Sequence, residues 1–295
     1  MNKQYRQINV AFPLWADAQA VALAHIASLL TEAHARGEIA LWWFIRKMPC
    51  WRIRYRVTDN STTVEERLHS RLVELVGAGH ILSATPVIYE PELRAFGGAK
   101  AMDHAHQLFH HDSRHLLDHL TTAHPHPDAS HHCELAILLC TALMRAASQD
   151  WYEQGDIWAR VAAHRQPALP RLDQLDRVRR LMSVDLTTLC RPGAALADHA
   201  EWANAFTTTG RQLAELAHSG RLDRGLRAVL AHHVIFTCNR HGLPHTTQAA
   251  LATTATTAVF GLDPQQQPSS ADAPTRHPGA YHSGQPHTRP VTDWT

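Results

Sequence analysis

The first ninety residues alternate between two hydrophobic patterns, and the order of these patterns predicts a topology. Four segments have the apolar and alternating character of strands: 5–12, 39–46, 51–57 and 81–89. An Ala- and Leu-rich helical pattern covers 16–35 and ends at Gly37, and a second helical pattern covers 63–77. The predicted order βαββαβ is that of a ferredoxin-like antiparallel sheet, in which both helices cover one face.

From residue 99 to residue 261 the helical pattern is almost continuous. The segments predicted as helices are 99–121, 131–147, 151–164, 171–184, 195–218, 222–240 and 245–260. These helices offer a cover for the second face of the sheet. The sequence therefore predicts an α+β protein.

The predicted domain organisation is one domain, 1–262, followed by a tail. The sheet portion is 5–90 and the helical portion is 99–261. Residues 263–295 are rich in Gln, Pro, Ser, His and Thr and poor in large aliphatics, so they cannot offset the entropy cost of ordering. We expect them to be disordered.

Composition excludes several classes of function. A net charge of +1 gives no global field that would attract nucleic acid or an anionic membrane. The N-terminus is polar where a signal peptide needs an apolar run, and no segment approaches the ~18 apolar residues of a membrane helix, so we expect a cytoplasmic location. The five cysteines are odd in number and lack CxxC spacing, which indicates buried thiols.

Three arginines alternate along the predicted strand 51–57 and therefore share one face: Arg52, Arg54 and Arg56. Guanidiniums side by side repel one another unless an anion lies among them. Each is a planar fork of donors that suits a carboxylate, so two of them could hold a dicarboxylate such as a glutamyl group. Alternatively, they lie on a solvated edge and pair with Glu90, Glu92 or other nearby acids.

The stretch Tyr89-Glu90-Pro91-Glu92-Leu93-Arg94-Ala95-Phe96-Gly97-Gly98 follows the last predicted strand and precedes a predicted helix. Its two glycines permit positive φ and close backbone approach at the helix start, where free N–H groups favour an anion. The alternative is a tight turn at Gly97 and Gly98 that is capped by Glu90 or Glu92.

Histidines are the candidate acid–base groups. His232 and His233 precede Asn239-Arg240 on the predicted helix 222–240, and a histidine near its ordinary pKa can take or give a proton at neutral pH. Because the chain has 24 histidines, most must be surface or satisfied core residues.

A metal or cofactor is not expected. His111 and His115 have the i, i+4 spacing of a zinc-protease helix, but Asp112 replaces the glutamate of that motif and no third ligand is specified. The chain has no dinucleotide fingerprint, no Walker lysine motif and no GxSxG elbow.

Taken in order, the arginine strand, the Tyr89-to-Gly98 stretch and Phe109-His110-His111-Asp112-Ser113 resemble the C-terminal elimination domain of lantibiotic dehydratases, including stand-alone thiopeptide-type bacteriocin biosynthesis proteins. The resemblance covers roughly residues 5–261. It implies that the strands Phe44-Ile45-Arg46 and Arg52-Ile53-Arg54 contribute arginines to the site, and that Asp112 and Ser113 are scaffold.

The chain departs from the family pattern at two positions. The family usually reads Arg-Tyr-Gly-Gly, whereas here Ala95 stands before Phe96, so Arg94 is offset by one residue. Full-length dehydratases place a histidine about four residues before the Asn-Arg pair, where this chain has Ile235. His232 and His233 are the nearest substitutes.

The resemblance implies a lyase of antibiotic biosynthesis that acts without a cofactor. A partner protein that uses glutamyl-tRNA would esterify Ser or Thr in a ribosomally made precursor peptide, and this chain would expel glutamate to leave dehydroalanine or dehydrobutyrine. In this hypothesis His232 or His233 removes the α-proton. The side chains that bind the glutamyl carboxylates and stabilise the enolate are Arg52, Arg54 and Arg94.

Two alternatives remain open. Thiopeptide pyridine synthases look like the same fold, and they join two dehydroalanines by a formal aza-[4+2] cycloaddition and release the leader peptide. They lack the glutamate-binding arginines, so the arginines here favour elimination, whereas the displaced histidine favours cyclisation. A non-catalytic partner that presents the peptide to a dehydratase would leave the arginine strand without a function.

Overall fold

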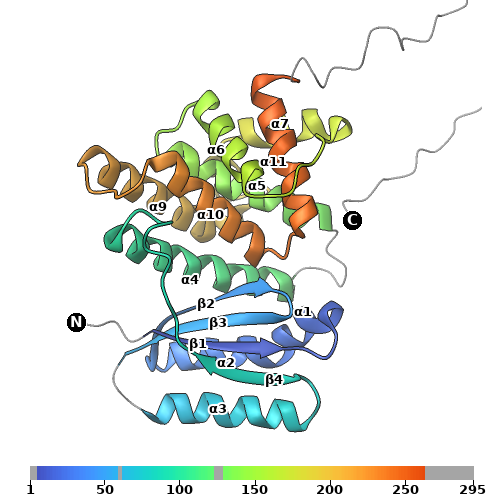
Figure 1. The fold of residues 1–295 in the computed structure, drawn as a ribbon, viewed down its shortest axis with the longest axis vertical. Helices are drawn as coiled ribbons and strands as arrows, with labels where there is room; N and C mark the ends of the chain where they lie inside the picture. Colours follow the sequence, from blue (N-terminus) through green and yellow to red (C-terminus); the bar gives the residue numbers. More distant parts are fainter. Residues whose placement is uncertain (1–4, 59–61, 123–128, 263–295) are drawn as a thin grey trace, which may run out of the picture.

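The computed structural model describes residues 5–58, 62–122 and 129–262, and the tail expected at 263–295 lies outside the described residues. Figure 1 shows a small sheet with helices behind and below it and a larger helical portion above it. The elements of the sheet portion are β1 (Tyr5–Ala11), α1 (Ala18–Val21), α2 (Ala27–Ala35), β2 (Ile39–Lys47), β3 (Cys50–Val57), α3 (Thr62–Gly77) and β4 (Ser83–Val87).

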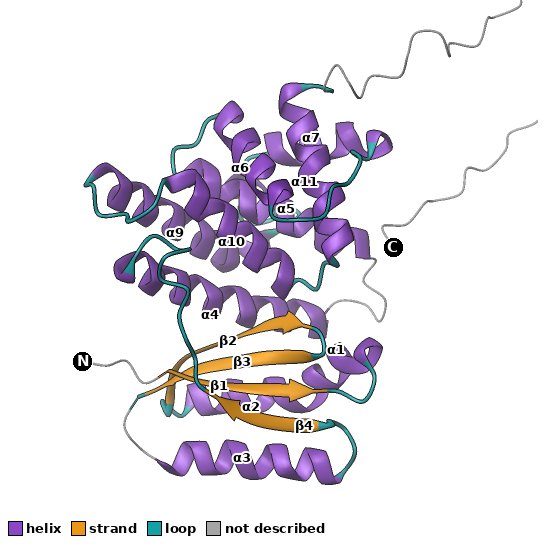
Figure 2. Cartoon of the chain, in the orientation of Figure 1, coloured by secondary structure: helices purple, strands orange, loops and turns teal. Residues whose placement is uncertain are grey.

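The sheet is antiparallel throughout, with strand order β2-β3-β1-β4. Its apolar face packs against α2 and α3, where Ile53 of β3 meets Leu30 and Leu68. Figure 2 shows α2 behind the strands and α3 below them. An α+β protein with a small antiparallel sheet is thus confirmed.

The helices between the strands differ in detail from the expected pattern, so the ferredoxin-like assignment stays a prediction. The helix expected over 16–35 consists of a 3-10 turn (Trp15–Asp17), α1, a π-helical turn (Ala22–Ile26) and α2. The strand expected over 81–89 forms only from Ser83 to Val87.

The helical portion follows the predicted pattern with bounds shifted by a few residues. Its main helices are α4 (Ala99–Thr122), α5 (Ala129–Ala146), α6 (Trp151–Ala163), α7 (Leu175–Ser183), α8 (Leu186–Leu189), α9 (Ala200–His218), α10 (Leu226–Arg240) and α11 (His245–Phe260). Within the described ranges, no helix is both long and apolar enough to cross a membrane.

Helix α4 lies along the free edge of β2. His110 Nδ1 is 3.0 Å from the carbonyl oxygen of Trp42, and Ser113 Oγ accepts the N–H of Phe44 at 3.3 Å. Burial lowers the pKa of His110 to about 4, so its ring is neutral. Two side chains of α4 therefore satisfy backbone groups that a fifth strand would otherwise pair.

The second face of the sheet is covered only in part by helices. Helices α4 and α10 contact β2, and a loop runs across the front of the other strands from β4 to α4 (Figure 2). We call residues 89–98 the crossing loop. The physical reason for this arrangement is that the second face carries the arginines of β3, which an apolar helix layer could not bury without partners.

Candidate functional site

Arg54 is the buried arginine of the second face. Its Cα lies opposite Gln7 of β1 and Trp43 of β2, and its side chain is only 5% exposed. The Arg54 Nε–H donates to Gln7 Oε1 at 2.7 Å, and the guanidinium carbon is 4.6 Å from the centre of the Tyr89 ring. Burial lowers the pKa of Arg54, while the carboxylate of Glu92 acts in the opposite direction.

The crossing loop brings Glu92 to this arginine. Glu92 Oε1 is 3.7 Å from Arg54 Nη2. The loop is held to the segment before α10, because the N–H of Asp223 donates to the Gly97 carbonyl at 3.0 Å and Arg224 Nη1 donates to the Ala95 carbonyl at 3.5 Å.

Both glycines of the loop are required by this close approach. Gly97 has φ +82° and Gly98 has φ +103°. A Cβ on Gly97 would lie 2.9 Å from Leu222 Cδ2, and a Cβ on Gly98 would lie 2.4 Å from Asp223 Oδ2. A side chain at either position would therefore push the loop away from the helix.

An aromatic cluster fixes the start of the loop. Tyr89, Trp43, Phe96 and Phe109 form a second core between β2 and α4. The Tyr89 hydroxyl is hydrogen-bonded to His106 Nε2 at 2.8 Å, and burial raises the pKa of Tyr89, so the phenol stays neutral. The position of the ring under Arg54 is thus set by packing and by one buried hydrogen bond.

His233 lies inside this cluster. Its exposure is 0%, and its ring centre is 4.9 Å from that of Phe96 and 6.1 Å from that of Phe109. Burial, with a smaller contribution from Arg240, lowers the pKa of His233 to about 3. A substrate would reach this imidazole only if the cluster opened.

His232, its neighbour, is half-buried and differs in its hydrogen bonding. His232 Nδ1 is 3.0 Å from the carbonyl oxygen of Ala228. Because a carbonyl oxygen only accepts, Nδ1 carries the hydrogen, and Nε2 of the neutral ring keeps its lone pair. Burial lowers the pKa of His232, and the charge of Glu92 acts in the opposite direction, so near neutral pH the ring is mainly an unprotonated base.

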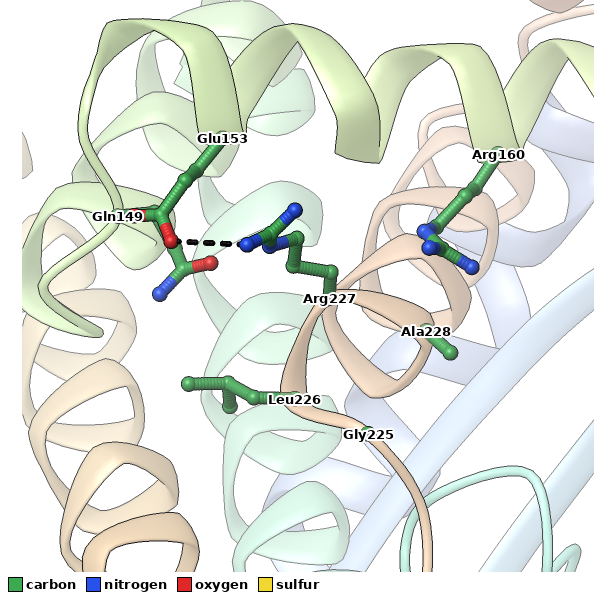
Figure 3. A pocket seen from close by; sticks show the side chains of 7 residues that line it. All are labelled: Gln149, Glu153, Arg160, Gly225, Leu226, Arg227 and Ala228. Atoms are coloured by element: carbon green, nitrogen blue, oxygen red, sulfur yellow. Dashed lines mark hydrogen bonds and ion pairs between the residues drawn. The ribbon is translucent and has the colours of Figure 1, made fainter.

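A cavity of about 350 Å³ opens between α6 and the first turn of α10. Figure 3 shows Glu153 and Arg160 projecting from α6 toward α10. Arg227 of α10 donates to Glu153 at 3.1 Å, and Ala228, whose carbonyl binds His232, also lines the cavity. The volume lies within the range of small-ligand sites.

The remaining arginines are divided among three environments. Arg52 is half-buried on the same face as Arg54, and Arg56 lies 5.9 Å from the centre of the Tyr5 ring. Arg94 is exposed on the crossing loop. Arg46 pairs with Trp51 in the register and therefore lies on the opposite face, where its Nη1 donates to Gln19 at 2.6 Å.

The structure thus brings together some of the predicted site residues. Arg52 and Arg54 lie on one face of β3, and the charge of Glu92, which is 3.7 Å from Arg54, acts on the pKa of both Arg54 and His232. Arg94 and His233 do not join them. The alternative in which the strand arginines pair with nearby acids named Glu92, and Glu92 does lie 3.7 Å from Arg54. Sequence reasoning did not link Glu92 to His232.

The cysteines and the histidine pair of α4 form no metal site. The rings of His111 and His115 are 6.5 Å apart, and in the part of the chain that the structure describes no group of three or more His, Cys, Asp or Glu side chains could hold a metal ion. All five cysteines are free; four are buried and Cys50 is half-buried.

The chain matches one protein family and is similar to several solved structures. The family model described as lantibiotic biosynthesis dehydratase C-term matches residues 10–259. The tRNA-dependent lantibiotic dehydratase MibB from Microbispora sp. 107891 is 15% identical with a TM-score of 0.66, over 88% of this chain and 28% of that chain. This chain therefore spans little more than a quarter of the length of that dehydratase.

Two shorter proteins are similar over nearly their whole length. TsrL is 17% identical with a TM-score of 0.59, over 88% of this chain and 97% of that chain. Pyridine synthase TbtD from thiomuracin biosynthesis is 14% identical with a TM-score of 0.53, over 86% of this chain and 97% of that chain. At these identities the likeness shows a shared fold. No curated protein sequence matches the chain.

Proposed function

Because the chain belongs to the lantibiotic biosynthesis dehydratase C-terminal family, we propose that it is a peptide-modifying enzyme that eliminates glutamate from glutamylated Ser or Thr residues of a ribosomally made precursor peptide. One observation carries this proposal. Arg54 is buried on the sheet 3.7 Å from Glu92 of the crossing loop, and the charge of Glu92 also acts on the pKa of the unprotonated base His232.

The arginines supply a binding site for carboxylates. Arg54 Nη1 is buried and has no hydrogen-bond partner among the described residues, and the side chain of Arg52 forms no hydrogen bond or ion pair with them. The glutamyl group carries a side-chain carboxylate and becomes a second carboxylate when it leaves. Buried guanidinium N–H groups bind such anions through charge-assisted hydrogen bonds, which are about twice as strong as neutral ones.

The proposed reaction is a β-elimination. His232 Nε2 takes the α-proton of the glutamylated residue, and the electrons of the Cα–H bond form the Cα=Cβ double bond. The bond from Cβ to the ester oxygen breaks, and glutamate departs as a carboxylate that Arg52 and Arg54 hold. His233 supports Phe96 from within the cluster, and Arg94 contacts the substrate from the exposed side of the crossing loop.

This reaction needs a supplier of the glutamyl ester. MibB is a tRNA-dependent dehydratase, and its chain is more than three times longer than the region that is similar to this protein. A partner protein that transfers glutamate from glutamyl-tRNA would supply this ester. In this proposal the chain binds the glutamylated peptide, contacts no nucleic acid itself and acts in the cytoplasm.

Pyridine formation by cycloaddition of two dehydroalanines is the second candidate. A specific observation favours it: Ala95, which stands where the family usually has an arginine, packs against the aromatic cluster, while Arg94 is exposed. The chain also spans 97% of the pyridine synthase TbtD.

Mass spectrometry of two synthetic peptides incubated with the purified protein separates these reactions. One peptide carries a glutamylated serine, and the other carries two dehydroalanines and a thiazole. Elimination predicts loss of glutamate from the first peptide and a strong reduction of that loss by Arg54→Ala. Conversion of the second peptide alone would overturn elimination in favour of cyclisation, and no reaction of either peptide would overturn both.

A further inference from the structure

A second cavity lies on the far side of α4 from the aromatic cluster. It measures about 540 Å³ and opens between α4 and α9. Its walls include Gln107, His111 and His115 of α4 and Asn204, Thr208 and Gln212 of α9. These positions recur every four residues on each helix, so one face of each helix supplies one wall.

The walls of this cavity offer neutral donors and acceptors. Burial, with Arg114 acting in the same direction, lowers the pKa of both His111 and His115, so both rings are mainly neutral at neutral pH. The amides of Gln107 and Gln212 form no hydrogen bond with the described residues. Each amide can therefore donate two hydrogen bonds and accept others from a ligand.

The one charged wall residue is already paired. Glu201 Oε2 is 3.3 Å from Arg114 Nη2 and 4.0 Å from His115 Nε2. The cavity lining includes no arginine or lysine, so a phosphate or a nucleotide would meet a carboxylate there and no cation. An apolar ligand would leave the amides without partners, which costs about 1–3 kcal/mol for each buried polar group.

We propose that this cavity binds a neutral, amide- and hydroxyl-rich segment of the precursor peptide outside the residues that are modified. A peptide matches the lining because each residue brings one N–H donor and one C=O acceptor. The inference rests on the proposed function for the identity of the peptide. Binding in the cavity would fix one part of the precursor while another part is free to reach the arginines.

Helix α4 lies between the cavity and the aromatic cluster, which is consistent with two separate binding sites. His106 and Phe109 of α4 face the aromatic cluster, while His111 and His115 face the cavity. A helix is about 10 Å wide and an extended chain rises about 3.3 Å per residue, so a handful of residues would connect the two sites.

A phage-displayed library of 12-residue peptides, selected on the immobilised full chain, tests the proposal without knowledge of the precursor. We expect enrichment of uncharged sequences rich in Asn, Gln, Ser and Thr. A synthetic peptide of the enriched sequence should then bind at least tenfold more weakly to Ala205→Phe, which fills the cavity. The matched control is Ala214→Phe, because Ala214 is equally half-buried on α9 but does not line the cavity.

Gln107→Phe provides a second variant with little risk to folding, because Gln107 is exposed and lies on the opposite wall. Equal affinity for the wild type and for both filling variants, or enrichment of charged or apolar sequences, would overturn the proposal. An empty selection would do the same.

The synthetic peptide with a glutamylated serine, described above, tests the elimination reaction without testing the cavity. Its turnover should change less than twofold in Ala205→Phe, since it does not extend to the cavity. A protein that binds the selected peptides through the cavity yet eliminates no glutamate would overturn only the elimination reaction.

Discussion

The carboxylate of Asp112 and the guanidinium of Arg240 form an ion pair in which neither side chain is exposed, with 2.5 Å between Oδ2 and Nε. The other oxygen, Oδ1, accepts from Trp202 Nε1 at 2.9 Å and lies 3.4 Å from His241 Nε2. One carboxylate therefore joins α4, α9 and the end of α10, the helix that carries His232.

Asp112→Asn should lower the free energy of unfolding by about 3–5 kcal/mol, because loss of one partner leaves a buried guanidinium without its counter-charge. Urea unfolding followed by circular dichroism measures this change. Glu74→Gln is the control, since the Arg71–Glu74 pair lies on the exposed surface of α3 and should be worth no more than about 1 kcal/mol. Similar losses in the two variants would contradict the role of Asp112.

Stability should fall as the pH is lowered from about 6.5, and His233 is one cause. Burial holds the folded pKa of His233 at about 3, whereas an unfolded histidine titrates near 6.5. Between these values the unfolded chain binds a proton that the folded chain does not, so each pH unit removes up to about 1.4 kcal/mol. His233→Leu should flatten this dependence in urea unfolding between pH 4 and pH 6.5.

Two comparisons isolate the contribution of His233. The exposed His69→Leu variant is the control, because it removes a histidine without changing the buried core. The Asp112 contribution is lost only at lower pH: burial alone would raise the pKa of Asp112, but Arg240 and His241 outweigh it and hold the pKa at about 2. If His233→Leu and the wild type lost stability in parallel above pH 4, His233 would not be a buried neutral ring.

His232→Gln should reduce the elimination rate by roughly 100- to 10,000-fold if His232 is the general base. Because burial lowers the pKa of His232, the base form persists below pH 6.5, and the acid limb of the kcat/KM profile should lie below that value. Single-turnover rates from pH 5 to pH 8 test this. A profile that is unchanged in His232→Gln would assign the proton transfer to another group.

Arg54→Ala should lower kcat/KM for the glutamylated peptide by roughly 10- to 150-fold, the equivalent of one charge-assisted hydrogen bond of about 1.5–3 kcal/mol. The effect should appear mainly in KM, since the side-chain carboxylate is bound before and during reaction. Arg94→Ala, at an exposed position, should change kcat/KM by less than about threefold. A larger effect at Arg94 than at Arg54 would mean that the glutamyl group binds on the exposed side of the crossing loop and not at the buried arginine.

Strand alternation was enough to place Arg52 and Arg54 on one face, because a strand repeats every two residues and the predicted strand 51–57 matches β3 within one residue. The glycines at 97 and 98 likewise indicated the close approach that the positive φ angles show. The strand face and the glycine turn both depend on local backbone geometry, which can be predicted from sequence patterns.

Local pattern could not distinguish His232 from His233. Neighbouring residues on a helix point about 100° apart, and α10 is apolar on nearly every side, so periodicity gave no inward direction. The environments of Arg94 and Glu92 depend on the path of the crossing loop, which is set by Tyr89 packing on Arg54 and by contacts with residues more than a hundred positions away. Such long-range contacts leave no periodic signal.

The edge of β2 limits how this chain can be divided. His110 and Ser113 occupy the hydrogen-bonding positions beside Trp42 and Phe44, whereas β4, at the other edge, is short and contains Pro86. A fragment that ended before α4 would expose a long apolar strand with unpaired backbone groups, which is a template for strand addition between molecules. We therefore expect the two portions to require expression as one chain, and a chimaera joined at the crossing loop would need to replace both of these α4 side chains to avoid such pairing.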